Sequence, residues 1–176
     1  MKKTLPTLPL TAAICLVAAM AMAQDKKPLS PPAKAEARIG GKTVTVNYNA
    51  PSKRNRVIMG ELVPYGKVWR TGANAATTLT TEADVMIGNL HVPAGKYTLF
   101  TIPGEKEWTL IVNKQTGQWG TNHDASQDLG RVKMTVKPLK NTVETFAIDV
   151  KPGAASNGVL TMSWENTEAS VPLTVH

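Results

Sequence analysis

Apolar and polar residues alternate along most of this chain from Ala35 onward, and glycine, proline and asparagine interrupt the alternation at short intervals. In one such segment Val132, Met134 and Val136 share a face, and lysine and threonine occupy the positions between them. A period of two is typical of a strand that is buried on one side, whereas an amphipathic helix needs a period near 3.6. We find no long segment with the helical period. The sequence therefore predicts an all-β protein.

Turn residues divide the alternating segments into about ten short strands. Gly40–Gly41, Gly88–Asn89 and Pro103–Gly104 each separate two strand-like segments, as the residues of tight hairpins do. We also expect residues 158–176 to form a closing hairpin. Short strands at regular spacing favour two packed layers. The predicted fold is a two-sheet antiparallel sandwich, jelly-roll or immunoglobulin-like, with a closed barrel as the alternative.

Residues 1–23 have the pattern of a secretory signal peptide. Lys2 and Lys3 precede an apolar run that is short for a membrane span, and the run ends in Ala-Met-Ala, a small-x-small cleavage pattern. We expect cleavage after Ala23 and export to the periplasm or the extracellular space, with no transmembrane segment in the mature chain. A retained membrane anchor is the alternative.

Cleavage would also change the chemistry that the chain can offer. It removes Cys15, the only cysteine, so the mature chain has no disulfide and no thiol nucleophile. Two lysines are lost as well, and the formal net charge falls from +7 to +5. Residues 24–34, rich in proline and charge, are predicted to be a flexible tether, and residues 35–176 a single β-sandwich domain.

Five residues around two glycine-containing turns are candidates for ligand binding. Arg70 offers a planar set of donors for a carboxylate or phosphate, and Asn74 can bind amides or hydroxyls while it tolerates a left-handed backbone. The other candidates, at strand-to-loop boundaries or in the second turn, are Trp69, Trp119 and His123. The tryptophan rings could stack on sugars if they are exposed.

A structural role is the alternative for the first turn. Arg70 would then pair with Glu82 or Asp84 at the edge of the core, and Asn74 would cap its own turn. Because neighbouring strand residues face opposite sides, Trp69 should point into the core and Arg70 toward the rim. We favour this structural corner, with an outer edge that touches a ligand.

Trp108 and Trp164 lie in alternating segments and are predicted to be core residues. The chain also lacks the common motifs of metal and catalytic sites. Its histidines, His91, His123 and His176, do not have the spacing of metal ligands. There is no G-x-S-x-G, no glycine-rich phosphate loop and no H-E-x-x-H. We therefore expect no metal and no cofactor.

Two functions remain open at this point. The favoured one is a non-catalytic ligand-binding or structural module of the cell envelope. The alternative is a hydrolase that acts on envelope carbohydrate, because the acids of such an enzyme need to be close only in space. Lys53, Arg54 and Arg56 form the densest basic patch, whose default interpretation is a solvated loop. If the patch binds a partner, we expect a glycan, a lipid headgroup or another anionic envelope component. Nucleic acid, which basic clusters also bind, is rarely met by an exported protein.

Four motifs, LVPYGKVWRTGAN, PAGKYTLFTIP, EWTLIVNK and WG, follow one another along the chain. With them the chain resembles an uncharacterised family of exported bacterial proteins, the domain of unknown function 2911, from about Ser30 to the C-terminus. The resemblance implies an all-β exported domain and supplies no activity, cofactor or catalytic residue. Family members often carry an acidic residue where this chain has Ala75 and an arginine where it has Ala50. If the family site is an Arg–Glu pair, this chain has lost part of it.

Overall fold

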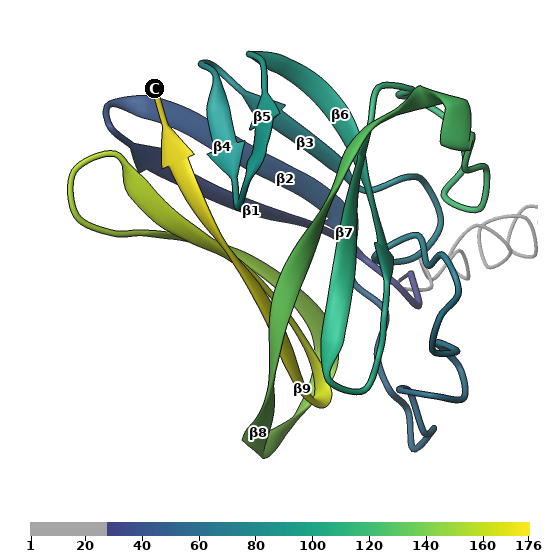
Figure 1. Ribbon diagram of the computed structural model, residues 1–176. Coiled ribbons are helices and arrows are strands. Elements are labelled where there is room, and N and C mark those ends of the chain that lie inside the picture. The colour runs from purple at the N-terminus through teal and green to yellow at the C-terminus, as the bar shows by residue number, and fades with distance from the viewer. Residues whose placement is uncertain (1–27) are drawn as a thin grey trace, which may run out of the picture.

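Nine strands account for more than half of residues 28–176, the part of the chain that the computed structural model describes (Figure 1). They are β1 (Pro32–Ile39), β2 (Lys42–Asn49), β3 (Thr78–Thr81), β4 (Val85–Ile87), β5 (Leu90–Val92), β6 (Gly95–Ile102), β7 (Glu107–Asn113), β8 (Asp128–Pro152) and β9 (Asn157–Val175). The short 3-10 helix η2 (Ala125–Gln127) precedes β8. The fold is all-β, as the alternation predicts.

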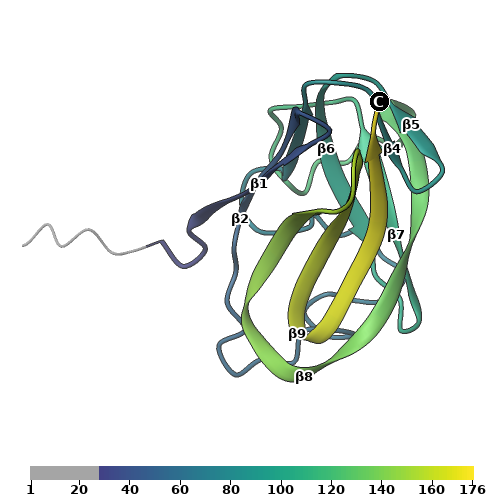
Figure 2. The same ribbon diagram turned by 90° about the vertical axis from the view of Figure 1, so that its left-hand side faces the viewer.

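Hydrogen bonds join all nine strands into one antiparallel sheet in the order β1-β2-β3-β6-β7-β8-β9-β4-β5. The prediction of two separate sheets is not confirmed, and β8 and β9, with 25 and 19 residues, are not short. Their pairing shifts register between Pro138 and Val143 and again before Ala147. Such bulges bend a strand without ending it. Figure 2 shows β8 and β9 as paired U-shaped strands that run in opposite directions, each descending, turning at the bottom and rising again.

The tight turns of the sequence have a mixed outcome. Hairpins at Gly40–Gly41, Gly88–Asn89 and Pro103–Gly104 are confirmed by the pairing of β1 with β2, β4 with β5 and β6 with β7. The prediction of a closing hairpin within residues 158–176 is wrong, because residues 158–175 belong to one strand, β9. Glu165 has a positive φ of 54° and bends β9 there, but the strand continues beyond it.

All nine strands contribute to one apolar core, and β1 packs against β8 and β9. Trp108 and Trp164 are each 1% exposed, which confirms that both belong to the core. Tyr48 of β2 is buried, and its hydroxyl accepts a hydrogen bond from the backbone N–H of Ile148 in β8 at 3.1 Å. This contact joins segments that lie far apart in the order of strands.

The connection between β2 and β3, residues 50–77, positions most of the candidate residues. Isolated β-bridges attach it to the sheet and to a second loop, and they pair Ser52 with Thr145, Trp69 with Thr101 and Ala75 with Trp119. These bridges supply partners for backbone groups that a loop would otherwise leave to water. Among residues 28–176, no helix has the length and apolar character needed to cross a membrane.

Candidate functional site

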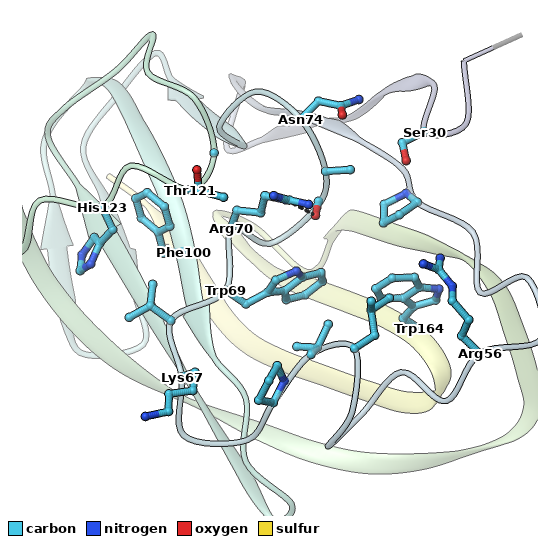
Figure 3. Close-up of a pocket in the computed structure, with 18 of the residues that line it drawn as sticks. Ser30, Arg56, Lys67, Trp69, Arg70, Asn74, Phe100, Thr121, His123 and Trp164 are labelled. Carbon is cyan, nitrogen blue, oxygen red and sulfur yellow. Dashed lines mark hydrogen bonds between the residues drawn. The ribbon is translucent and has the colours of Figure 1, made fainter. Parts of the chain in front are cut away.

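A cavity of about 520 Å³ opens where the 50–77 connection meets the loop before β8 (Figure 3). This volume lies within the usual range for small-molecule sites. Its lining residues are Leu29, Ser30, Pro51, Arg54, Arg56, Leu62, Val63, Pro64, Lys67, Val68, Trp69, Arg70, Gly72, Ala73, Asn74, Phe100, Gly120, Thr121, His123 and Trp164.

Four of the five predicted ligand-binding residues line this cavity, namely Trp69, Arg70, Asn74 and His123. Trp119 does not line it. The Trp119 side chain is 55% exposed and immediately precedes the lining residue Gly120. The structure thus brings the two candidate turns of the sequence together at one site.

Aromatic rings form one wall of the cavity. Trp69 stacks on Trp164 with 5.8 Å between ring centroids and 17° between planes. Trp69 also contacts Phe146 edge-on at 4.9 Å, so this wall is continuous with the core. On another side Phe100 packs against His123 at 4.7 Å. Trp69 therefore lies between core and cavity, and its ring presents a surface on which a flat or apolar group can pack.

Four cationic side chains line the cavity, Arg54, Arg56, Lys67 and Arg70, and its lining among residues 28–176 includes no aspartate or glutamate. Figure 3 shows Arg56 at the Trp164 end and Arg70 near Trp69. The sequence predicted the patch containing Arg54 and Arg56 but did not connect it with Arg70, and it missed Lys67. Only the fold shows that these charges share one cavity.

Arg56 is held by the backbone of its own loop. Its Nε donates to the carbonyl oxygen of Lys53 at 2.9 Å and its Nη2 to that of Ser52 at 2.7 Å. The loop is anchored in turn by Glu165, whose carboxylate accepts the backbone N–H of Met59 at 3.2 Å and lies 3.6 Å from Lys53 Nζ. The bend in β9 thus positions the basic loop through Glu165.

The predicted pairing of Arg70 with Glu82 or Asp84 is wrong. Arg70 Nε donates to the Gly72 carbonyl oxygen at 3.3 Å, while Glu82 accepts from the Thr43 N–H at 2.7 Å. Asp84 accepts from the Ala94 N–H at 2.9 Å.

The course of β3 explains this outcome. β3 pairs with β2 so that Thr81 lies opposite Val44 and Thr78 opposite Asn47. The carboxylates that follow Thr81 therefore lie toward the start of β2, whereas the Arg70 turn packs near Asn49 at its end, where the Ala73 N–H donates to the Asn49 carbonyl oxygen at 3.1 Å.

The turn from Arg70 to Thr77 is held by buried threonines. Thr71 Oγ1 donates to Thr101 Oγ1 at 3.1 Å, and Thr77 Oγ1 donates to the Thr71 carbonyl oxygen at 2.7 Å. Asn74 has a φ of 56°, so it adopts the left-handed backbone that the sequence indicated. Its side chain is exposed and caps no turn within the described part of the chain, and its carbonyl oxygen accepts the Gly120 N–H at 3.0 Å.

Gly120 allows the two turns to approach each other. A Cβ at this position would lie 2.6 Å from the Asn74 carbonyl oxygen and 2.9 Å from Arg70 Cδ, closer than real Cβ contacts come. The stem of Arg70 therefore packs directly on the Gly120 backbone, and this contact helps to orient the guanidinium.

The polar group beside His123 is an ion-pair network centred on Asp128. Asn113 Nδ2, His123 Nε2 and Arg131 Nη2 each lie 2.8 Å from its carboxylate oxygens. Burial alone would raise the pKa of Asp128, but the hydrogen bonds from Asn113, His123 and Arg131 together lower the pKa below its ordinary value. The network orients His123 at the edge of the cavity.

We expect Asp128→Asn to lower the free energy of unfolding at neutral pH by about 1–3 kcal/mol, because three donors lose a charged acceptor. A lowered folded-state pKa stabilises the protein above the unfolded pKa of about 3.9, and this contribution is lost as the pH falls through the folded value. Urea unfolding at pH 7 and in acid should therefore show the variant differing most at pH 7. The exposed Asp149→Asn is the control; equal effects of the two changes would contradict the prediction.

No group of three His, Cys, Asp or Glu side chains in the described part is arranged to hold a metal ion. A sequence model described as protein of unknown function (DUF2911) matches residues 30–173, which confirms the resemblance drawn from the motifs. No curated protein and no solved structure matches the chain.

Proposed function

This chain belongs to the DUF2911 family of proteins of unknown function, and we propose that it is an exported, non-catalytic module that binds a small anionic ligand in the cavity beside Trp69 and Arg70. The observation that carries the proposal is the lining, in which four cationic side chains and no carboxylate among residues 28–176 surround an aromatic wall. Such a lining attracts an anion and gives its apolar part a surface to pack on.

Arg70 is the residue best placed to bind the anion. Within residues 28–176 only its Nε donates a hydrogen bond, at 3.3 Å to the Gly72 carbonyl oxygen, so its Nη groups can bind a carboxylate or phosphate. None of the ion pairs among residues 28–176 involves Arg70, Arg56 or Lys67. An incoming anion therefore does not have to displace a carboxylate of the described chain.

The ring of Trp69 defines the second half of the ligand. It is stacked on Trp164 and backed by the core, so it is a rigid surface that loses little freedom when a ligand packs on it. A ligand that joins a phosphate or carboxylate to a ring or a short apolar chain uses both features. Asn74, at the rim, can hydrogen-bond a hydroxyl of an anionic glycan.

The hydrolase alternative requires an acid and a base or nucleophile on either side of a glycosidic bond. The cavity lining within the described residues includes no aspartate or glutamate to supply them, which is why we prefer binding. Incubation with envelope polysaccharide and an assay for released reducing ends separates the two functions. Turnover would reject the binding module in favour of the hydrolase.

Binding itself can be measured by the change in intrinsic tryptophan fluorescence, to which Trp69 and Trp164 at the cavity contribute, during titration with phenyl phosphate, inorganic phosphate and phenol. We expect phenyl phosphate to bind most tightly, because it alone supplies both a dianion and a ring. Arg70→Gln should weaken its binding about 10- to 100-fold, since hydrogen bonds to charged groups contribute about 1.5–3 kcal/mol.

The matched control is Arg38→Gln, which removes an exposed arginine of β1 outside the cavity lining. It should leave the affinity for phenyl phosphate unchanged. No saturable binding of phenyl phosphate, or an equal loss in the two variants, would reject the proposed site.

Export is tested on the protein from its native cells. We expect recovery from the cell envelope or the medium, with an N-terminus at Gln24 by mass spectrometry. An intact Met1, or recovery from the cytosol, would contradict this part of the proposal.

A further inference from the structure

Three exposed apolar side chains line the cavity, and three more lie close to its lining residues in the sequence. Seven large hydrophobic residues are exposed among residues 28–176. Three line the cavity (Leu29, Leu62 and Val68), two lie in the 57–68 loop that also contains Leu62 and Val68 (Val57 and Tyr65), and Trp119 precedes the lining residue Gly120. The seventh, Val159, lies in β9.

Single exposed hydrophobics are normal on a protein surface, but a cluster of them around a cavity marks an interaction site. The side chain of Leu29 is 71% exposed, and those of Leu62 and Val68 are 46% and 43% exposed. They come from two separate segments, the chain before β1 and the 50–77 connection, which meet at the cavity. The apolar mouth is therefore a product of the fold, not of one apolar stretch of sequence.

Cationic side chains accompany the apolar ones. Arg54 and Lys67 line the same cavity and are exposed, and Arg56 and Arg70 lie there partly buried. Exposed apolar groups next to positive charges form the surface that proteins use to bind the interface of an anionic bilayer, where apolar groups enter the acyl boundary and cations contact headgroup phosphates. Tyr65 and Trp119 have the amphipathic rings that favour the same interface.

We infer that the mouth of the cavity docks on an anionic lipid bilayer, with Leu29, Leu62 and Val68 inserted at the acyl boundary and Arg54 and Lys67 bound to lipid phosphates. The uniform positive charge of the lining favours a lipid surface, since a protein partner would have to present an acidic face with matching apolar pockets. This docking goes beyond the proposed function, because a soluble anion can enter the cavity without any contact to the rim.

Co-sedimentation with vesicles tests the docking. We expect the protein to bind vesicles of equal parts phosphatidylglycerol and phosphatidylcholine, to bind phosphatidylcholine alone much more weakly, and to be released by salt. The double variant Leu62→Ser/Val68→Ser should weaken binding to the anionic vesicles roughly tenfold or more, because two apolar side chains no longer leave water. Both positions are exposed, so the variant should melt as the parent protein does.

Val159→Ser is the matched control, an exposed apolar residue far along the sequence and outside the cavity lining. It should bind the anionic vesicles as the parent protein does. The inference is overturned if the parent does not bind them, if the double variant binds as well as the parent, or if Val159→Ser loses as much. Capture of a protein that depends on Leu62 and Val68, without vesicle binding, would overturn it in favour of a protein partner.

Titration with phenyl phosphate separates this inference from the proposed function. Both measurements are made on the parent protein, because Leu62 and Val68 line the same cavity as Arg70. Phenyl phosphate binding without vesicle binding would overturn the docking alone. Vesicle binding without phenyl phosphate binding would overturn the proposed ligand site and support the docking.

Discussion

Replacing Trp164 with alanine should lower the free energy of unfolding by about 3–5 kcal/mol, the usual cost of removing a large buried aromatic side chain. Trp164 is 1% exposed, stacks on Trp69 at 5.8 Å and lies 5.8 Å from Phe146. Its Nε1 donates to the Glu144 carbonyl oxygen at 3.1 Å, so the change also removes one of the two hydrogen bonds that this oxygen accepts; the other comes from the Lys53 N–H at 2.7 Å. Urea unfolding followed by circular dichroism measures the loss.

Trp119→Ala is the matched control for this prediction. The same side chain is removed, but at Trp119 it is 55% exposed, and the change in the free energy of unfolding should stay within about 0.5 kcal/mol. Equal losses in the two variants would mean that the stacked wall of the cavity does not contribute to the core. A Trp164→Ala protein that still folds should also bind phenyl phosphate weakly, because Trp69 loses its support.

Gly72→Ala should lower the free energy of unfolding by about 2–4 kcal/mol, because two unfavourable terms coincide. Gly72 has a φ of 149°, a conformation that residues with a Cβ rarely adopt. A Cβ there would lie 3.0 Å from both the Asn49 carbonyl oxygen and Thr77 Oγ1. The turn must move to relieve these contacts, and Arg70, whose Nε binds the Gly72 carbonyl oxygen, moves with it.

Gly41→Ala separates the two terms. Gly41 has a φ of 79°, but no atom of residues 28–176 lies within 4 Å of the place that a Cβ would occupy, so only backbone strain of about 1–2 kcal/mol is expected. Thermal and urea unfolding compare the two variants, and phenyl phosphate titration reports on Arg70. A Gly72→Ala protein no less stable than Gly41→Ala, with unchanged affinity, would show that the packing against Asn49 is unimportant.

The residues that line the cavity show which local features the sequence predicted correctly. Strand alternation predicted that Trp69 packs toward the core and Arg70 toward the rim; Trp69 does pack against the core, and Arg70 lines the cavity. The left-handed conformation of Asn74 was also indicated by its residue type. The predicted ion pair of Arg70 was wrong. Glu82 and Asp84 are near Arg70 in the sequence but lie beyond β3, toward the start of β2, whereas the Arg70 turn packs at its end.

The long strands show a second limit. Residues 131–138 and 144–151 each alternate as a strand should, and the interruption between them looks like a turn in the sequence. In the structure it is a pair of bulges in β8, matched by the bend at Glu165 in β9. Whether an interruption ends a strand or bends it depends on the neighbouring strand, which continues to supply hydrogen bonds beyond the bend.

The sequence by itself determined the fold class, the hairpins between β1 and β2, β4 and β5, and β6 and β7, and the burial of Trp108 and Trp164. These features follow from the period of the side chains and from turn residues a few positions apart, which act within one strand or one hairpin. Only the tertiary structure decided that β8 and β9 continue through the bend and that Arg54, Arg56, Lys67 and Arg70 line one cavity. Those contacts depend on bridges between residues as distant as Ser52 and Thr145, and no local pattern encodes such a pairing.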